Sequence, residues 1–142
     1  MPPSMDELEQ NYGEGTQLFQ QGDLHGAGNA FTRIIRQSPG VAPAHNGLGL
    51  CLYGLGNPAE ALAQFEAAIR ADPFFGSAHI NRGMVLRDQG KLDAALVAME
   101  KAVALDPRNP NAHSNRGMVL TEMQQAAAAN ACFDRCLQLD PD

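Results

Sequence analysis

A fixed interval of 34 residues organises almost the whole chain. Prolines, glycines, alanines and large apolar side chains each recur at this interval. The columns are Pro39, Pro73, Pro107 and Pro141; Gly15, Gly49, Gly83 and Gly117; Ala27, Ala61, Ala95 and Ala129; and Phe31, Phe65, Met99 and Phe133. Columns in phase over four cycles define a tandem repeat, with cycles at residues 8–41, 42–75, 76–109 and 110–142.

Each cycle contains two stretches with the apolar spacing of an amphipathic helix. In the second cycle, Leu48, Cys51, Leu52 and Leu55 recur at i, i+3, i+4 and i+7. The pattern predicts an all-α chain, with residues 1–7 as a lead-in and residues 8–142 as the repeat domain. The expected first helices are 8–21, 42–55, 76–89 and 110–123, and the expected second helices are 24–37, 59–71, 92–105 and 126–139.

Helix-breaking residues follow these stretches. Gly22, Gly56 and Gly90 follow the first helices, where a residue free to adopt positive φ is favoured. Gln124 replaces the glycine in the fourth cycle. The repeat prolines follow the second helices and prevent them from continuing.

Charge and composition exclude several classes of function. The net charge is −6 with only ten Lys and Arg, which argues against binding a nucleic-acid backbone. No run of about 18 apolar residues exists, so membrane insertion is not expected. The opening residues lack a signal-peptide pattern, and three cysteines suggest no disulfide framework, so we expect a cytoplasmic location.

The repeat resembles the tetratricopeptide repeat, whose signature is a small residue at position 8, Ala at 20, an aromatic at 24 and Pro at 32. In the second cycle these positions are Gly49, Ala61, Phe65 and Pro73. The resemblance implies a right-handed α-solenoid of four helix-turn-helix repeats whose first helices line a concave groove. The residues it places in the groove are Tyr12, Thr16, Phe19, Asn46, Leu50, Tyr53, Ile80, Asn81, Met84, Arg87, Asp88, Ser114, Asn115, Met118, Thr121 and Glu122.

Asn81 and Asn115 occupy the same position in adjacent repeats. An amide side chain both donates and accepts, so such a ladder could pair with the backbone of an extended peptide. The pattern resembles the asparagine-ladder repeats of O-linked N-acetylglucosamine transferases. The alternative is that each Asn forms a hydrogen bond within its own helix pair. The Lys and Arg with which related domains hold a chaperone's C-terminal carboxylate have no counterpart here.

Other recurring polar residues have plainer explanations. His45, His79 and His113 lie one repeat apart, about 10 Å, which is too far for a shared metal, so we expect them to pack at helix interfaces and expect no metal or cofactor. Cys132 and Cys136 lack further ligands. Arg82 and Arg116 either face a ligand or pair with Asp72 and Asp106. No nucleophile with an adjacent base, and no phosphate loop, indicates an enzyme.

The sequence therefore predicts a scaffold that binds a protein or peptide. Two alternatives remain open. The chain could be the N-terminal substrate-recruiting or regulatory domain of a longer enzyme, for example a glycosyltransferase or sulfotransferase. It could also self-associate through its uncapped C-terminal helix, because apolar groups on that helix lack a covering partner.

Overall fold

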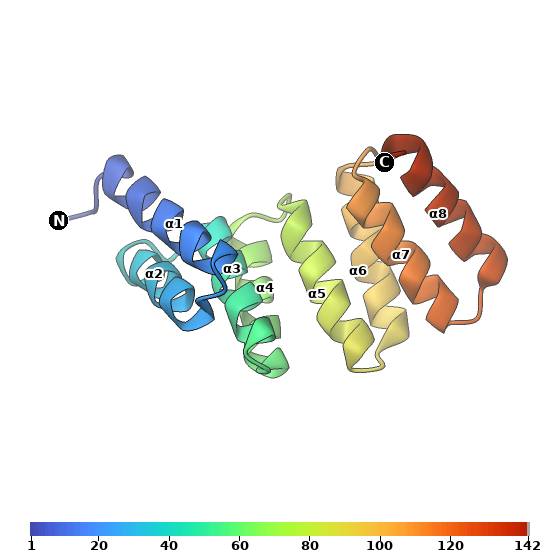
Figure 1. Ribbon diagram of the computed structural model, residues 1–142, viewed down its shortest axis with the longest axis horizontal. Helices are drawn as coiled ribbons and strands as arrows, with labels where there is room; N and C mark the ends of the chain where they lie inside the picture. Colours follow the sequence, from blue (N-terminus) through green and yellow to red (C-terminus); the bar gives the residue numbers. More distant parts are fainter. Residues whose placement is uncertain (142) are drawn as a thin grey trace. The chain divides into compact units, whose positions relative to one another are not determined.

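The computed structural model describes residues 1–141, and every regular element in that range is an α-helix (Figure 1). Packing divides the chain into two compact units, residues 1–78 and the chain from His79 onward. The boundary falls within the fifth helix. The helices are α1 (Met5–Gln20), α2 (Leu24–Gln37), α3 (Ala42–Gly54), α4 (Pro58–Ala71), α5 (Gly76–Asp88), α6 (Leu92–Leu105), α7 (Pro110–Glu122) and α8 (Ala126–Leu139).

Helices that are adjacent in sequence pack together within each unit. In the first unit α1 packs on α2, α2 on α3, and α3 on α4, while α1 also touches α3. In the second unit α6 packs on α7, and α7 on α8. The prediction of an all-α chain built from helix pairs is confirmed.

The glycine column lets the paired helices approach closely. A Cβ atom built on Gly49 would lie 2.5 Å from the ring of Phe65, and one on Gly83 would lie 2.7 Å from the methyl group of Met99. Real Cβ atoms do not approach other atoms this closely, so a larger residue at Gly49 would displace the Phe65 ring or push the pair apart, whereas one at Gly83 would first displace the flexible end of Met99. The glycine and aromatic columns therefore have one cause, which is a side chain of the second helix packed on the bare backbone of the first.

Phe31 meets two such glycines, one from each neighbouring helix. Added Cβ atoms would lie 2.8 Å from its ring at Gly15 of α1 and 2.7 Å from it at Gly47 of α3. The ring thus lies between α1 and α3 and belongs to the core cluster of the first unit. The buried members of that cluster are Ala27, Phe31, Ile34, Ala44 and Cys51.

The turns after the first helices adopt the expected left-handed conformation. Gly22, Gly56 and Gly90 have φ of 83°, 83° and 75°. Gln124 takes the same conformation with φ of 62°, although a side chain disfavours it. The repeat geometry therefore overrides the local preference of this residue.

The second helices end where the prolines predict, and the aspartates before those prolines have a local role. The Asp72 Oδ1 atom accepts a hydrogen bond of 3.0 Å from the backbone N–H of Phe74. Asp106 accepts one of 3.1 Å from the N–H of Arg108. These side chains thus stabilise the turn into the next repeat.

The first helix begins at Met5, earlier than the expected residue 8. Ser4 caps it, because its Oγ accepts a hydrogen bond of 3.1 Å from the backbone N–H of Glu7. A Ser followed three residues later by a Glu is a recognised helix-start pattern, and the repeat register masked it. The additional turn brings Met5 to the edge of a pocket.

Candidate functional site

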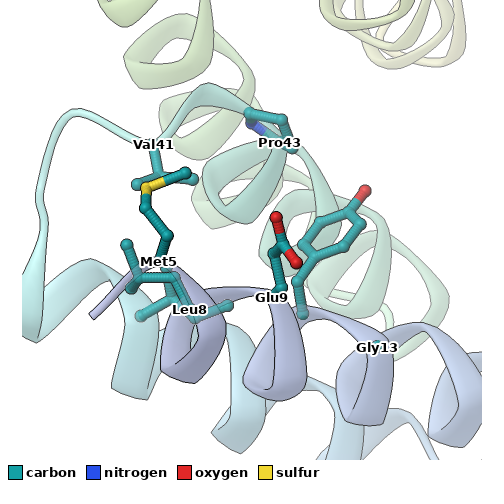
Figure 2. A pocket seen from close by; sticks show the side chains of 8 residues that line it. Met5, Leu8, Glu9, Gly13, Val41 and Pro43 are labelled. Carbon is teal, nitrogen blue, oxygen red and sulfur yellow. The ribbon is translucent and has the colours of Figure 1, made fainter. Parts of the chain in front are cut away.

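An open apolar pocket of about 440 Å³ lies in the first unit between α1 and the start of α3 (Figure 2). In Figure 2 the Met5 side chain extends from α1 towards Val41, while Pro43 lies across the pocket from Leu8 and Glu9. The lining residues are Met5, Leu8, Glu9, Tyr12, Gly13, Ile34, Val41 and Pro43.

The floor of the pocket is part of the hydrophobic core. Ile34 is only 1% exposed, and Leu8 and Val41 pack against the same core cluster. Gly13 leaves one side open, because a Cβ atom added there would meet nothing within 4 Å. The pocket is therefore a rigid apolar recess with room beside the backbone of α1.

Tyr12 is the pocket residue that the sequence predicted. Its ring centroid lies 5.7 Å from that of Phe31, with the ring planes tilted by 58°, a favourable aromatic geometry. The ring nevertheless remains 40% exposed. The hydroxyl of Thr16 donates to the backbone carbonyl of Tyr12 at 3.0 Å, so that predicted side chain is used within its own helix.

Glu9 is the one charged residue that lines the pocket. Neighbouring carboxylates on α1 are engaged: Glu7 accepts from the Gln37 amide at 3.3 Å, and Glu14 pairs with Arg33 at 3.2 Å. Within residues 1–141, Glu9 has neither a hydrogen bond nor an ion pair from its side chain. The rim therefore carries an uncompensated negative charge.

The other predicted groove residues of the first unit lie outside this pocket. Phe19, near the end of α1, is 36% exposed. Asn46, on α3, is 8% exposed and therefore buried in the protein interior. Leu50 and Tyr53 are half-buried on the same helix.

In the second unit, predicted residues from α5 and α7 contact one another through Arg87. Its Nε lies 3.5 Å from a Glu122 carboxylate oxygen, and its Nη2 lies 3.6 Å from Asp88. A third nitrogen, Nη1, lies 3.6 Å from the Met118 sulfur. This guanidinium is 14% exposed and links two helices, so its charge is largely balanced inside the unit.

The remaining predicted residues of this unit differ in exposure. Ile80 is 7% exposed and forms part of the interior. The Asn115 amide donates at 2.8 Å to the backbone carbonyl of Asn111, and the Thr121 hydroxyl donates at 2.9 Å to that of Gly117. The donor of Asn115 is thus used within its own helix. Three further residues are half-buried: Asn81, Met84 and Ser114.

The repeated histidines hold the loop before their own helix. The Nε2 atom of His45 lies 2.7 Å from the carbonyl oxygen of Pro39, and that of His113 lies 2.7 Å from the carbonyl of Pro107. Both rings are about nine-tenths buried. The 34-residue spacing of these histidines therefore follows from the spacing of the prolines. In the part of the chain that the structure describes, no three His, Cys, Asp or Glu residues are placed to hold a metal ion.

Arg116 corrects one expected ion pair. Its Nη2 atom lies 3.8 Å from Glu100 of α6, whereas the carboxylate of Asp106 is used by the turn that follows it. The ion-pair partner therefore comes from within α6, at Glu100, and not from Asp106 just after the end of that helix.

Sequence reasoning missed most of the pocket, namely Met5, Leu8, Glu9, Gly13, Ile34, Val41 and Pro43. Met5 fell in the expected lead-in, and the others are brought together by the packing of α1 on α2 and its contact with α3. The helix-capping pattern of Ser4 and Glu7 was the available signal.

Across residues 1–141 we find no helix long and apolar enough to cross a membrane.

Comparison with known proteins gives a consistent result. Three family models match, described as tetratricopeptide repeat (residues 12–74), TPR repeat (83–124) and tetratricopeptide repeat (110–142). No curated protein sequence matches the chain.

Solved structures of similar fold are numerous. MamA from Desulfovibrio magneticus RS-1 is 25% identical, with a TM-score of 0.80 over 94% of this chain and 76% of that one. A thermophilic tetratricopeptide protein of Thermus thermophilus, TTC0263, is 21% identical, with a TM-score of 0.85 over 94% and 75%. The first such domain of Spaghetti (RPAP3), bound to the HSP90 peptide SRMEEVD, is 18% identical, with a TM-score of 0.81 over 86% and 99%. The helix pairs, the repeat columns and these matches together place the chain in the tetratricopeptide repeat family.

Proposed function

We propose that this chain is a protein-interaction scaffold that binds an extended polypeptide and anchors one large apolar side chain in the pocket between α1 and α3. The observation that carries the proposal is the pocket itself, an apolar recess of about 440 Å³ beside the half-exposed ring of Tyr12. A neighbour of the same fold holds a peptide, which supports this class of ligand.

The pocket supplies affinity through burial. Enclosing a Leu, Ile, Met or Phe side chain contributes about 1.5–3 kcal/mol, and the rigid floor costs little further ordering. Met5 is 70% exposed in the free chain, so binding of the anchor side chain also buries apolar surface of the scaffold.

Glu9 determines the preferred sequence next to that anchor. An unpaired carboxylate at the rim attracts a Lys or Arg beside the apolar residue and repels Asp or Glu. The peptide SRMEEVD carries several carboxylates, so the preferred ligand here differs in charge from the ligand of that neighbour.

The second unit has candidate contact residues of its own on α5 and α7. They are Asn81, Met84, Arg87, Asp88, Ser114, Asn115, Met118, Thr121 and Glu122, whereas Ile80, which is 7% exposed, belongs to the interior. The Asn115 donor is already used by the Asn111 carbonyl, so this side chain offers its amide oxygen to a peptide N–H.

The test is selection of binders from a display library of random peptides, followed by fluorescence anisotropy with the selected sequences. Gly13→Leu fills the pocket, and Gly13→Ala is the matched control that adds a single methyl group. We expect Gly13→Leu to weaken binding about ten-fold or more, because the anchor loses its buried site. Gly13→Ala should change binding less than about three-fold.

Selected peptides should carry a large apolar residue next to Lys or Arg, and Glu9→Gln should weaken them by about two- to five-fold in low salt. Equal affinity for wild type and Gly13→Leu would contradict the proposed anchor site. Equal affinity for wild type and Glu9→Gln would remove only the charge preference.

A further inference from the structure

A second pocket, of about 310 Å³, lies in the second unit between α7 and α8. It is lined by His113 and Arg116 from α7 and by Ala128, Ala131, Cys132 and Arg135 from α8. It shares no residue with the pocket between α1 and α3, and the proposed function does not use it.

Two nitrogen atoms at this pocket lack a protein partner. The Nε atom of Arg116 is buried and forms no hydrogen bond to any described residue. The ring of His113 is 8% exposed, and its Nε2 atom is bonded to the carbonyl of Pro107. A carbonyl can only accept, so Nε2 carries the hydrogen, and Nδ1 is left without a partner among residues 1–141. Buried polar groups are nearly always paired, so the Arg116 Nε atom indicates a missing ligand, and the His113 Nδ1 atom at the same pocket is free to accept a hydrogen bond from it.

The first unit shows one way in which this place can be filled. There the Nδ1 atom of His45 lies 2.8 Å from the side-chain oxygen of Gln64. Two repeats later the position of Gln64 is occupied by Cys132, whose side chain is shorter. Without an amide at this position, the Nδ1 atom of His113 lacks the partner that His45 has, and the recess beside it is open.

The recess is also positively charged within a chain whose net charge is −6. Among residues 1–141, the Arg135 side chain donates only to the neutral Gln138 side chain, at 3.2 Å. Arg116 has one ion pair, with Glu100 at 3.8 Å, and that carboxylate is 52% exposed and therefore well screened. Two arginines thus line the pocket, and among the described residues Glu100, which is half-exposed, is the one carboxylate paired with them.

We propose that this pocket binds a phosphate group, free or as a small phosphomonoester. Guanidinium N–H groups at Arg116 and Arg135 donate to phosphate oxygens in the paired geometry that arginine favours. A singly protonated phosphate also carries an O–H, which can donate to Nδ1 of His113. A carboxylate has no such hydrogen near neutral pH, so phosphate satisfies both unpartnered nitrogens and a carboxylate satisfies one. The small side chains of Ala128 and Ala131 leave space for the ester group.

The test uses two-dimensional ¹H–¹⁵N NMR of the whole chain at constant ionic strength. Inorganic phosphate, O-phosphoserine and acetate are titrated separately, with chloride as the reference ion. We expect saturable shifts confined to amides near residues 113–116 and 128–135 with phosphate, and at most weak ones with acetate. Tighter binding of O-phosphoserine than of inorganic phosphate would identify a phosphomonoester as the ligand, and the reverse order would identify free phosphate.

Three variants of the pocket and one control sharpen the result. Arg116→Gln should weaken phosphate about ten-fold or more, whereas Arg33→Gln, a matched change in the first unit, should leave it unchanged. Glu100→Gln removes the competing carboxylate and should tighten phosphate by about two- to three-fold. Cys132→Gln restores the arrangement at Gln64 and should abolish the response by filling the recess.

Shifts that are equal for phosphate and chloride, or unchanged affinity in Arg116→Gln, would overturn the proposal. Cys132 packs against Leu120 and Ala129, so that variant alone tests the fold as well as the site. Arg116→Gln and Glu100→Gln change side chains that are partly exposed, so their results do not depend on the packing of Cys132.

Discussion

The Nε2 atom of His45 donates to the carbonyl oxygen of Pro39 at 2.7 Å, which ties α3 to the end of the preceding repeat. His45→Phe keeps a buried ring but leaves this carbonyl and the Gln64 amide without a partner. We expect unfolding to become easier by about 1–3 kcal/mol, measured by urea denaturation. His25→Phe, at an exposed position, is the control and should stay within about 0.5 kcal/mol of wild type. Equal midpoints for the two variants would show that the bond contributes nothing.

Two glycines in α1, Gly13 and Gly15, should respond in opposite ways to the same substitution. Gly13→Ala places its methyl group in open space within a helix and should stabilise the chain by about 0.5–1 kcal/mol. Gly15→Ala places a methyl group 2.8 Å from the Phe31 ring and should destabilise by about 1–3 kcal/mol, less the same helix gain. Thermal unfolding followed by circular dichroism distinguishes them. Stabilisation by both would mean that α1 and α2 can separate at little cost.

Gln124 should be improved by glycine. Its φ of 62° is costly for an L-residue and free for glycine, so Gln124→Gly should stabilise by about 1 kcal/mol. Gly90→Ala makes the reverse change at the equivalent turn, where φ is 75°, and should destabilise by a similar amount. Chemical denaturation of both variants provides the measurement. A loss of stability in Gln124→Gly would show that the glutamine side chain makes a compensating contact.

Cys51 should make stability depend on alkaline pH. Burial raises the pKa of its thiol from 9.0 to about 11. Between these values the unfolded chain releases the proton and the folded chain retains it, so the free energy of unfolding falls as pH rises through this window. The expected measurement is a steeper fall for wild type than for Cys51→Ala in urea titrations from about pH 9 to about pH 11. Parallel curves would indicate that the folded thiol ionises as readily as a free one.

The repeat and its helix ends could be predicted from the sequence because each column meets one local requirement. Gly49 faces the Phe65 ring, and Gly56 adopts positive φ, so few other residues serve at either place. Such requirements recur with the repeat and are visible as columns. Gln124 shows their limit, since the turn forms there without a glycine.

The pockets could not be predicted in the same way, because neither follows from one of the repeat columns. Met5 reaches the first pocket only because Ser4 starts the helix before the repeat register begins. The second lies beside Cys132, which stands where the repeats have Ala30, Gln64 and Ala98 and where the long glutamine is the exception. Residues that recur every 34 positions do not reveal features that occur in one repeat alone. They become informative once the equivalent contacts of two repeats are compared atom by atom.

The placement of Phe31 between Gly15 and Gly47 has a dynamic consequence. The Phe31 ring packs on both α1 and α3. If α1 frays, the ring is exposed on one side, and the packing of α3 against it is weakened as well. Amide hydrogens in α1 and α3 should therefore exchange with solvent in a shared opening event rather than independently. A peptide that grips α1 would slow exchange in both helices, and the end of the array would stiffen as it is occupied.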